Sequence, residues 1–171
     1  MGPIEIVFLV IIVMFGVIGV VRGFNRELGV TLMLLVGLLV LVLLETEFNE
    51  QFKTLLAAIA PSAADQAIAK AAIFCGFLTI LTFISYQGIT LSFAGAGQSN
   101  VFGLGAGLLN GYLYAGSLWY YLDRAGWPLL PFDKNYSDFY NFALELLPPA
   151  VFKWPYLIAL VVIMLIMRVW K

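Results

Sequence analysis

Two long apolar runs at the start of the chain, separated by one short charged corner, constrain the fold more than any other feature. The first run extends from Ile4 to Val21 and the second from about Glu27 to Leu44. The hydrocarbon core of a bilayer is about 30 Å thick, and a helix needs about 20 mostly apolar residues to cross it. The sequence therefore predicts two membrane spans that are joined by the corner Gly19–Glu27.

The rest of the chain has the same apolar character. Hydrophobic residues make up 63% of the sequence and charged residues 11%, with a mean hydropathy of +0.99, whereas soluble domains carry about 25% charged residues. At about 20 residues per span, the 171 residues leave room for four to five spans. We predict an all-α fold, a polytopic membrane helix bundle that forms a single integral membrane domain. The expected spans are residues 4–21, 27–44, 71–93, 101–122 and 155–170.

Two shorter segments have the periodicity of amphipathic helices. Between Phe48 and Ala60, apolar residues recur at helical spacing opposite polar residues. This segment is either a helix that lies in the membrane interface or an extramembrane helix packed on the spans. Pro61 and Ser62 are expected to end it and to start the next helix, because Pro fits a first helical turn and Ser is a good N-cap. A second amphipathic helix is expected over residues 137–147.

A row of small residues marks the fourth predicted span. Gly103, Gly107 and Gly111 repeat every four residues, and Ala115 continues the row. Small residues on one helix face allow another backbone to approach closely, and such contacts drive helix association in membranes. We expect this row, of the kind called a glycine zipper, to be a packing face, either within this chain or between copies of it.

The charges of the first corner have two alternative interpretations. Arg22 and Arg26 are four residues apart, so they share a face if the corner is helical. They either anchor the topology beside lipid phosphates or bind an anionic lipid or a partner subunit. Glu27 follows Arg26 directly, and local charge pairing and capping of the second span are its expected roles.

The distribution of positive charge predicts an orientation. Five spans place the termini on opposite sides, and Lys and Arg concentrate on the cytoplasmic side. On the side of the corner, four basic residues lie in two short stretches of sequence: Arg22, Arg26, Arg168 and Lys171. The other side has five, spread over two longer connections: Lys53, Lys70, Arg124, Lys134 and Lys153. We expect the N-terminus outside and the C-terminus in the cytoplasm.

The corner also resembles a known pattern. Arg22-Gly23-Phe24-Asn25-Arg26-Glu27, at the end of an apolar first span, is similar to the R-G-F-x-R-E signature of the bacterial colicin V production (CvpA) family. The resemblance extends through about residue 120. It implies a small protein of the bacterial plasma (inner) membrane, associated with colicin export and envelope maintenance.

The chain departs from this family in its fourth predicted span. The family tends to have G-x-x-x-G-x-x-R-G there, and Asn110 stands in place of the arginine. The Asp-Arg pair that usually opens that helix is replaced by residues 98–100. The fifth predicted span lies outside the resemblance.

The residue content offers little for catalysis. The sequence has no histidine and a single cysteine, Cys75, so it lacks the commonest metal ligand and general base and any CxxC pair. All ten carboxylates lie at predicted span ends or in connections. The net charge of −1 gives no basic field for nucleic acid. We predict no catalytic residue, no metal site, no cofactor and no nucleic-acid partner, and therefore not an enzyme.

Two functions remain, and their partners differ. The first is a non-catalytic envelope scaffold or an accessory subunit of a larger membrane complex, with membrane lipids and other membrane protein subunits as partners. The alternative is a small channel or transporter component. Its polar path would run near the intramembrane residues Asn110 and Gln87, with Thr79 and Thr82 beside them. Asn110 is expected to form an interhelical hydrogen bond in either case.

Overall fold

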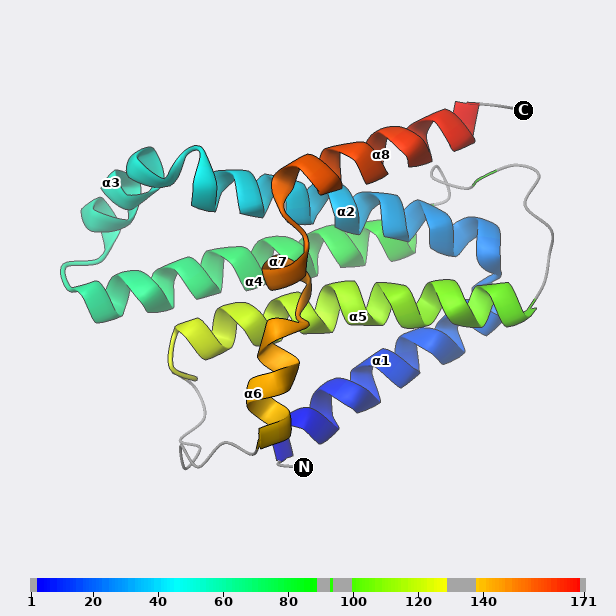
Figure 1. The fold of residues 1–171 in the computed structure, drawn as a ribbon, viewed down its shortest axis with the longest axis horizontal. Helices are drawn as coiled ribbons and strands as arrows, with labels where there is room; N and C mark the ends of the chain where they lie inside the picture. Colours follow the sequence, from blue (N-terminus) through cyan, green and yellow to red (C-terminus); the bar gives the residue numbers. More distant parts are fainter. Residues whose placement is uncertain (1–2, 89–92, 94–99, 129–137, 170–171) are drawn as a thin grey trace.

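The chain folds as a bundle of helices. The computed structural model describes residues 3–88, 93, 100–128 and 138–169, and in these residues it contains helices and no strand (Figure 1). The helices are α1 (Pro3–Arg22), α2 (Phe24–Thr46), α3 (Asn49–Ile59), α4 (Ala63–Gln87), α5 (Asn100–Arg124), α6 (Asp138–Glu145), α7 (Pro148–Val151) and α8 (Trp154–Val169).

Three of the described helices, α1, α2 and α4, are long and apolar enough to cross a membrane. The first two follow from the uninterrupted apolar runs on either side of the corner. Together with the shorter apolar helix α8, they confirm the predicted all-α membrane helix bundle. The expected number of four to five spans therefore depends on α5 and α8.

Helix α5 is the central helix of the bundle. Its 25 residues give a length of about 38 Å at 1.5 Å per residue, but its glycines, tyrosines and Asn110 make it less apolar than its neighbours. It contacts α1, α2 and α4, and Figure 1 shows it running alongside them. A helix that is covered by other helices needs less apolar surface toward lipid. Residues 101–122 thus form one continuous helix, and its crossing of the membrane stays a prediction.

Helix α8 is shorter than a full span. Its 16 residues cover about 24 Å, less than the roughly 30 Å of a hydrocarbon core. It packs along α2 through Leu157 and Val161, which are buried against the leucines of that helix. The described part of the predicted segment 155–170 is therefore helical, and one face of this helix packs on α2.

The helix that covers most of the predicted third span, residues 71–93, begins before residue 71. Helix α4 begins at Ala63, because the Ser62 hydroxyl caps it by accepting a hydrogen bond from the backbone N–H of Asp65 over 3.1 Å, as expected for this serine. Lys70 does not delay the helix, since its ammonium group pairs with Glu45 at 2.6 Å. The helix ends at Gln87, and residues 89–92 lie outside the described part of the chain.

Both predicted amphipathic segments are helical. In α3, Phe52 stacks on Phe74 of α4 with 5.2 Å between ring centroids, while Leu55 and Ile59 are exposed. The helix thus packs on the spans and also presents an apolar side outward, so both interpretations of this segment stay open. Helix α6 covers most of the second segment and ends shortly before Pro148.

The bundle has two distinct ends. One, which we call the corner end, contains the turn from α1 to α2 and the C-terminal ends of α4 and α8 (Figure 1). The opposite end contains α3, the start of α4 and the last turns of α5 (Figure 1). Arg22, Arg26 and Arg168 thus lie at the corner end, while Lys134 and Lys171 lie outside the described residues.

The small-residue row of α5 faces α1. A Cβ atom added to Gly103 would meet the carbonyl oxygen of Gly19, and one added to Gly107 would meet the carbonyl oxygen of Phe15. A Cβ on Gly111 would lie 2.7 Å from the Cα of Ile12. Ala115, one turn further, is fully buried. The two backbones can approach this closely only because these α5 positions have no side chain.

Candidate functional site: a buried polar cluster at the corner

One residue makes the corner between α1 and α2. Gly23 has a φ of 84°, a backbone conformation that glycine adopts without steric cost and L-residues rarely enter. Its N–H donates to the carbonyl of Gly19 over 2.9 Å, and its own carbonyl accepts from the N–H of Glu27 over 3.3 Å. The helical hydrogen bonding therefore changes direction within a single residue, which brings Arg22 and Glu27 to the same side of the corner.

Glu27 pairs with Arg22, not with Arg26. The Nη1 of Arg22 lies 3.3 Å from the Oε1 of Glu27, and the Glu27 side chain is fully buried. Arg26, which we expected to be the partner, is exposed. The reason is helical geometry, because adjacent residues of a helix point in different directions. Glu27 thus forms a local ion pair, as predicted, but its partner is Arg22 and not Arg26.

Two further helices donate to the same carboxylate. The phenol of Tyr86, near the end of α4, donates to Oε2 of Glu27 over 2.9 Å. The Nδ2 of Asn110, in α5, donates to the same oxygen over 2.8 Å and to the Glu27 backbone carbonyl at 3.1 Å. One carboxylate of α2 thus accepts hydrogen bonds from α1, α4 and α5.

Thr31 and Arg22 make further hydrogen bonds around Glu27. The Oγ1 of Thr31 donates to the Oδ1 of Asn110 over 2.7 Å, and Thr31 and Asn110 are both buried. Arg22 donates through Nη2 to the backbone carbonyl of Tyr86 over 3.1 Å, and its guanidinium carbon lies 4.4 Å from the centre of the Tyr86 ring. We call Arg22, Glu27, Thr31, Tyr86 and Asn110 the corner cluster.

A second glutamate connects the same helices at the opposite end of α2. Glu45 pairs with Lys70 of α4 at 2.6 Å, and the phenol of Tyr121 in α5 lies 3.5 Å from its Oε2. Between the two ends, the hydroxyl groups of Thr79 in α4 and Tyr114 in α5 are 3.1 Å apart. Polar contacts therefore join α2, α4 and α5 near both ends of α2, and one further contact joins α4 to α5 between them.

The predicted polar residues do not gather in one place. Asn110 lies in the corner cluster, Thr79 contacts Tyr114, and Thr82 returns its hydroxyl to the carbonyl of Leu78 over 2.6 Å. Gln87 is exposed at the C-terminal end of α4. Within the described residues, no three His, Cys, Asp or Glu side chains lie close enough to hold a metal ion. What the arrangement offers is a fixed internal network rather than a set of groups open to a substrate.

Two members of the corner cluster were not singled out by the sequence. Thr31 stands four residues after Glu27, and i, i+4 neighbours face the same side of a helix, so its place beside Glu27 follows from spacing. Tyr86 shares a helix face with Thr79 and Thr82, which marks that face as polar. The sequence had no signal that this face meets Glu27, because 59 residues separate the two.

Comparison with known protein families agrees with the corner signature. The family model described as Colicin V production protein matches residues 4–148. The chain belongs to the colicin V production protein family. The match includes the corner cluster and extends past residue 120, the limit of the recognisable motifs, to the first residue of α7. Helix α8 lies outside it. No curated protein and no solved structure matches the chain.

The fold gives a physical reason for three residues of the family signature in this chain. Gly23 permits the corner, and Arg22 and Glu27 form the ion pair across it. Asn110, which replaces the arginine that the resemblance leads one to expect, donates to the same glutamate.

Proposed function

We propose that this family member is a non-catalytic membrane scaffold or an accessory subunit of a larger membrane complex. The observation that carries the proposal is the contrast between the interior and the outer surface of the bundle. Inside, the polar groups of the corner cluster bond to one another and hold four elements of the chain in place. Outside, α1 and α4 present apolar side chains. Such a bundle is suited to binding neighbours rather than to converting a substrate.

Helix α1 supports this proposal most clearly. It contacts α5 along one side, and its other side is an exposed row without a charged residue between Glu5 and Arg22. The row consists of Ile6, Val7, Leu9, Val10, Val13, Met14, Val17 and Val21, each about half exposed or more. In a bilayer this surface meets either lipid or an apolar helix of another subunit, and packing between helices then depends on shape.

Site-specific photocrosslinking tests the proposal. A photoreactive amino acid at Val17 on α1, or at Phe83 on α4, is expected to capture a discrete membrane protein in native membranes. Both positions are about 60% exposed, so the substitution does not disturb the core. Purification in mild detergent should yield the same protein. A lone chain after mild purification, with only lipid crosslinked at both sites, contradicts the proposal.

We further propose that the protein lies in the bacterial plasma membrane with the corner end in the cytoplasm. The basic residues Arg22, Arg26 and Arg168 at that end support this orientation by the positive-inside rule. A reporter that is active only in the cytoplasm, fused after Lys171, should be active. An active periplasmic reporter at the same position would reverse the orientation.

A small channel or transporter component is the second candidate, and Glu27 is the observation that favours it. A fully buried carboxylate in a helix long and apolar enough to cross a membrane is costly and is often functional. If this function holds, Gln87→Leu or Asn110→Leu abolishes solute flux in liposomes while the helical content is retained. Absence of flux for every solute tested would eliminate this candidate.

A further inference from the structure

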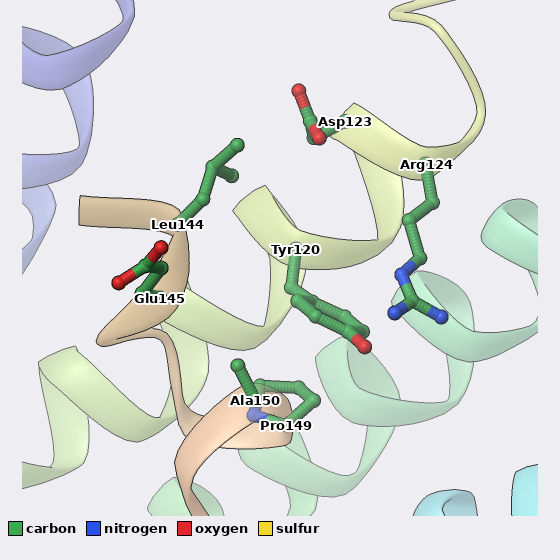
Figure 2. A pocket seen from close by; sticks show the side chains of 7 residues that line it. All are labelled: Tyr120, Asp123, Arg124, Leu144, Glu145, Pro149 and Ala150. Atoms are coloured by element: carbon green, nitrogen blue, oxygen red, sulfur yellow. The ribbon is translucent and has the colours of Figure 1, made fainter. Parts of the chain in front are cut away.

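An open cavity beside the last turn of α5 is lined by charged residues of both signs and by a tyrosine. It has a volume of about 480 Å³ and lies between the last turn of α5 and the segment formed by α6 and α7. Figure 2 shows its lining, with the Tyr120 ring in the middle, Arg124 on one side of it and Glu145 on the other. Pro149 and Ala150 of α7 lie along the remaining wall (Figure 2).

The charges of this cavity are of both signs and are separated. Arg124 is exposed, and its guanidinium carbon lies 4.3 Å from the centre of the Tyr120 ring. Glu145 is exposed, and neither residue forms an ion pair with another described residue. The cavity thus offers one cation and one carboxylate on opposite sides of an aromatic ring, each available to a ligand.

Asp123 adds a second carboxylate that is held in place. The phenol of Tyr140 donates to Oδ1 of Asp123, and the indole Nε1 of Trp127 donates to the Tyr140 oxygen over 3.0 Å. The lining therefore carries two carboxylates against one guanidinium. An anionic ligand would be repelled by this balance, whereas a zwitterion with an ammonium group and a phosphate complements it.

We propose that this cavity binds the headgroup of a zwitterionic phospholipid with a primary ammonium group, of the phosphatidylethanolamine type. The phosphate pairs with Arg124, and the ammonium donates to Glu145. A quaternary ammonium fits less well, because it has no N–H to donate to a carboxylate and prefers an open aromatic face. The nearest aromatic face, that of Tyr120, is already covered by Arg124.

A lipid rather than a free headgroup follows from the surroundings of the cavity. It lies beside the last turn of α5, where the phenol of Tyr121 is 3.5 Å from Glu45, near the C-terminal end of α2. The end of a helix that is long and apolar enough to cross a membrane is expected at the headgroup level of a bilayer. Exposed apolar side chains continue from the cavity along α6 and α7, where acyl chains can contact them. These are Phe139, Phe142, Leu146 and Val151.

Native mass spectrometry of the purified protein, with defined lipids added, tests the proposal. The probes are dioleoyl phosphatidylethanolamine, phosphatidylcholine and phosphatidylglycerol. The wild type should retain phosphatidylethanolamine about tenfold more than the other two. Glu145→Gln should remove the preference for ethanolamine over choline, and Arg124→Gln should weaken the binding of all three about tenfold. Circular dichroism checks that both variants fold, and Glu145→Gln, on an exposed turn of α6, is the variant expected to fold normally.

The exposed ion pair of α3 supplies matched controls. Glu50 and Lys53 lie 3.0 Å apart at the same end of the bundle, and no cavity residue belongs to α3. Glu50→Gln and Lys53→Gln should leave lipid retention unchanged. The proposal fails if phosphatidylglycerol is preferred, if all three lipids are retained equally, or if the cavity variants behave like these controls. Soluble glycerophosphoethanolamine that binds as tightly as the lipid would assign the cavity to a free zwitterion and overturn the lipid as its ligand.

Discussion

The amide nitrogen of Asn110 lies 2.8 Å from the carboxylate of Glu27, although the two residues are 83 positions apart in the chain. This contact connects the central helix α5 to the first turn of α2. It leaves the Glu27 carboxylate and the Asn110 amide both satisfied, because Arg22, Tyr86 and Thr31 complete the hydrogen bonds. The packing of the bundle at the corner end therefore depends on a buried polar cluster, which the first two predictions test.

Removing the Glu27 carboxylate should destabilise the bundle. Glu27→Ala leaves Arg22, whose side chain is only 18% exposed, without its partner. Loss of one member of a buried ion pair costs about 3–5 kcal/mol, and we expect the lower end of this range because Arg22 keeps some exposure. Unfolding in detergent monitored by circular dichroism measures the change. Glu27→Gln retains an acceptor for Asn110 and should lose less; equal loss in both variants would show that hydrogen bonding to this side chain contributes nothing.

The contact between Asn110 and Glu27 should appear as an energetic coupling. A double-mutant cycle with Asn110→Leu and Glu27→Ala isolates this interaction from the effects of each substitution alone, because Glu27→Ala removes the acceptor that Glu27→Gln would keep. We expect a coupling of about 0.6–2 kcal/mol, the range found for polar interactions between membrane helices. Gln87→Leu combined with Glu27→Ala is the control, since Gln87 is exposed and is not bonded to the cluster. Strict additivity of the Asn110 and Glu27 substitutions contradicts the structure.

The glycines of α5 should differ sharply in their tolerance of a methyl group. At Gly107, a Cβ atom meets the backbone of α1 at Phe15 and Gly16, so Gly107→Ala forces the helices apart at a cost of about 1–3 kcal/mol. At Gly105 a Cβ meets nothing within 4 Å. Gly105→Ala should be neutral, or stabilising by up to about 1 kcal/mol through helix propensity. Thermal unfolding of the two variants side by side gives the comparison, and equal effects would mean that α1 does not pack on this face.

The two lysines with glutamate partners should contribute unequally. Lys70 is 29% exposed and its partner Glu45 is 13% exposed, whereas Lys53 and Glu50 are 59% and 82% exposed. Exposed ion pairs are worth about 0–1 kcal/mol and are weakened by solvent and salt. We therefore expect Lys70→Met to destabilise the protein by about 1 kcal/mol and Lys53→Met to have no measurable effect. Chemical denaturation at low salt measures both, and the reverse order would place Lys70 outside the packed bundle.

The pH dependence at the opposite end should reflect Tyr140 in α6. Burial, followed by the hydrogen bond to Asp123, raises the pKa of Tyr140 above its ordinary value of 10.0. The unfolded chain therefore releases this proton near pH 10 while the folded chain retains it. The resulting stabilisation is present below pH 10 and is lost as the pH rises above it. The free energy of unfolding should fall less steeply between about pH 9 and 11 in Tyr140→Phe than in the wild type; identical slopes would contradict the raised pKa.

Sequence alone determined the class of this protein and the position of its corner. Apolar runs of about 20 residues can be recognised directly in the sequence, because crossing a bilayer requires a minimum length and an apolar surface of each helix. The hexapeptide at Arg22–Glu27 is likewise local, and the family match over residues 4–148 agrees with it. The row Gly103, Gly107 and Gly111 identified a packing face through its spacing alone.

Only the tertiary structure decided which groups meet. The partner of Glu27 is Arg22 rather than its neighbour Arg26, because the φ of 84° at Gly23 and the helical phase determine where each side chain points. Lys70, after which the third membrane span was expected to begin, lies inside α4 and pairs with Glu45, 25 residues earlier in the chain. Contacts between distant segments depend on how whole helices pack. A hydrophobicity pattern shows which face of each helix is apolar, but it does not show which other helix packs on that face.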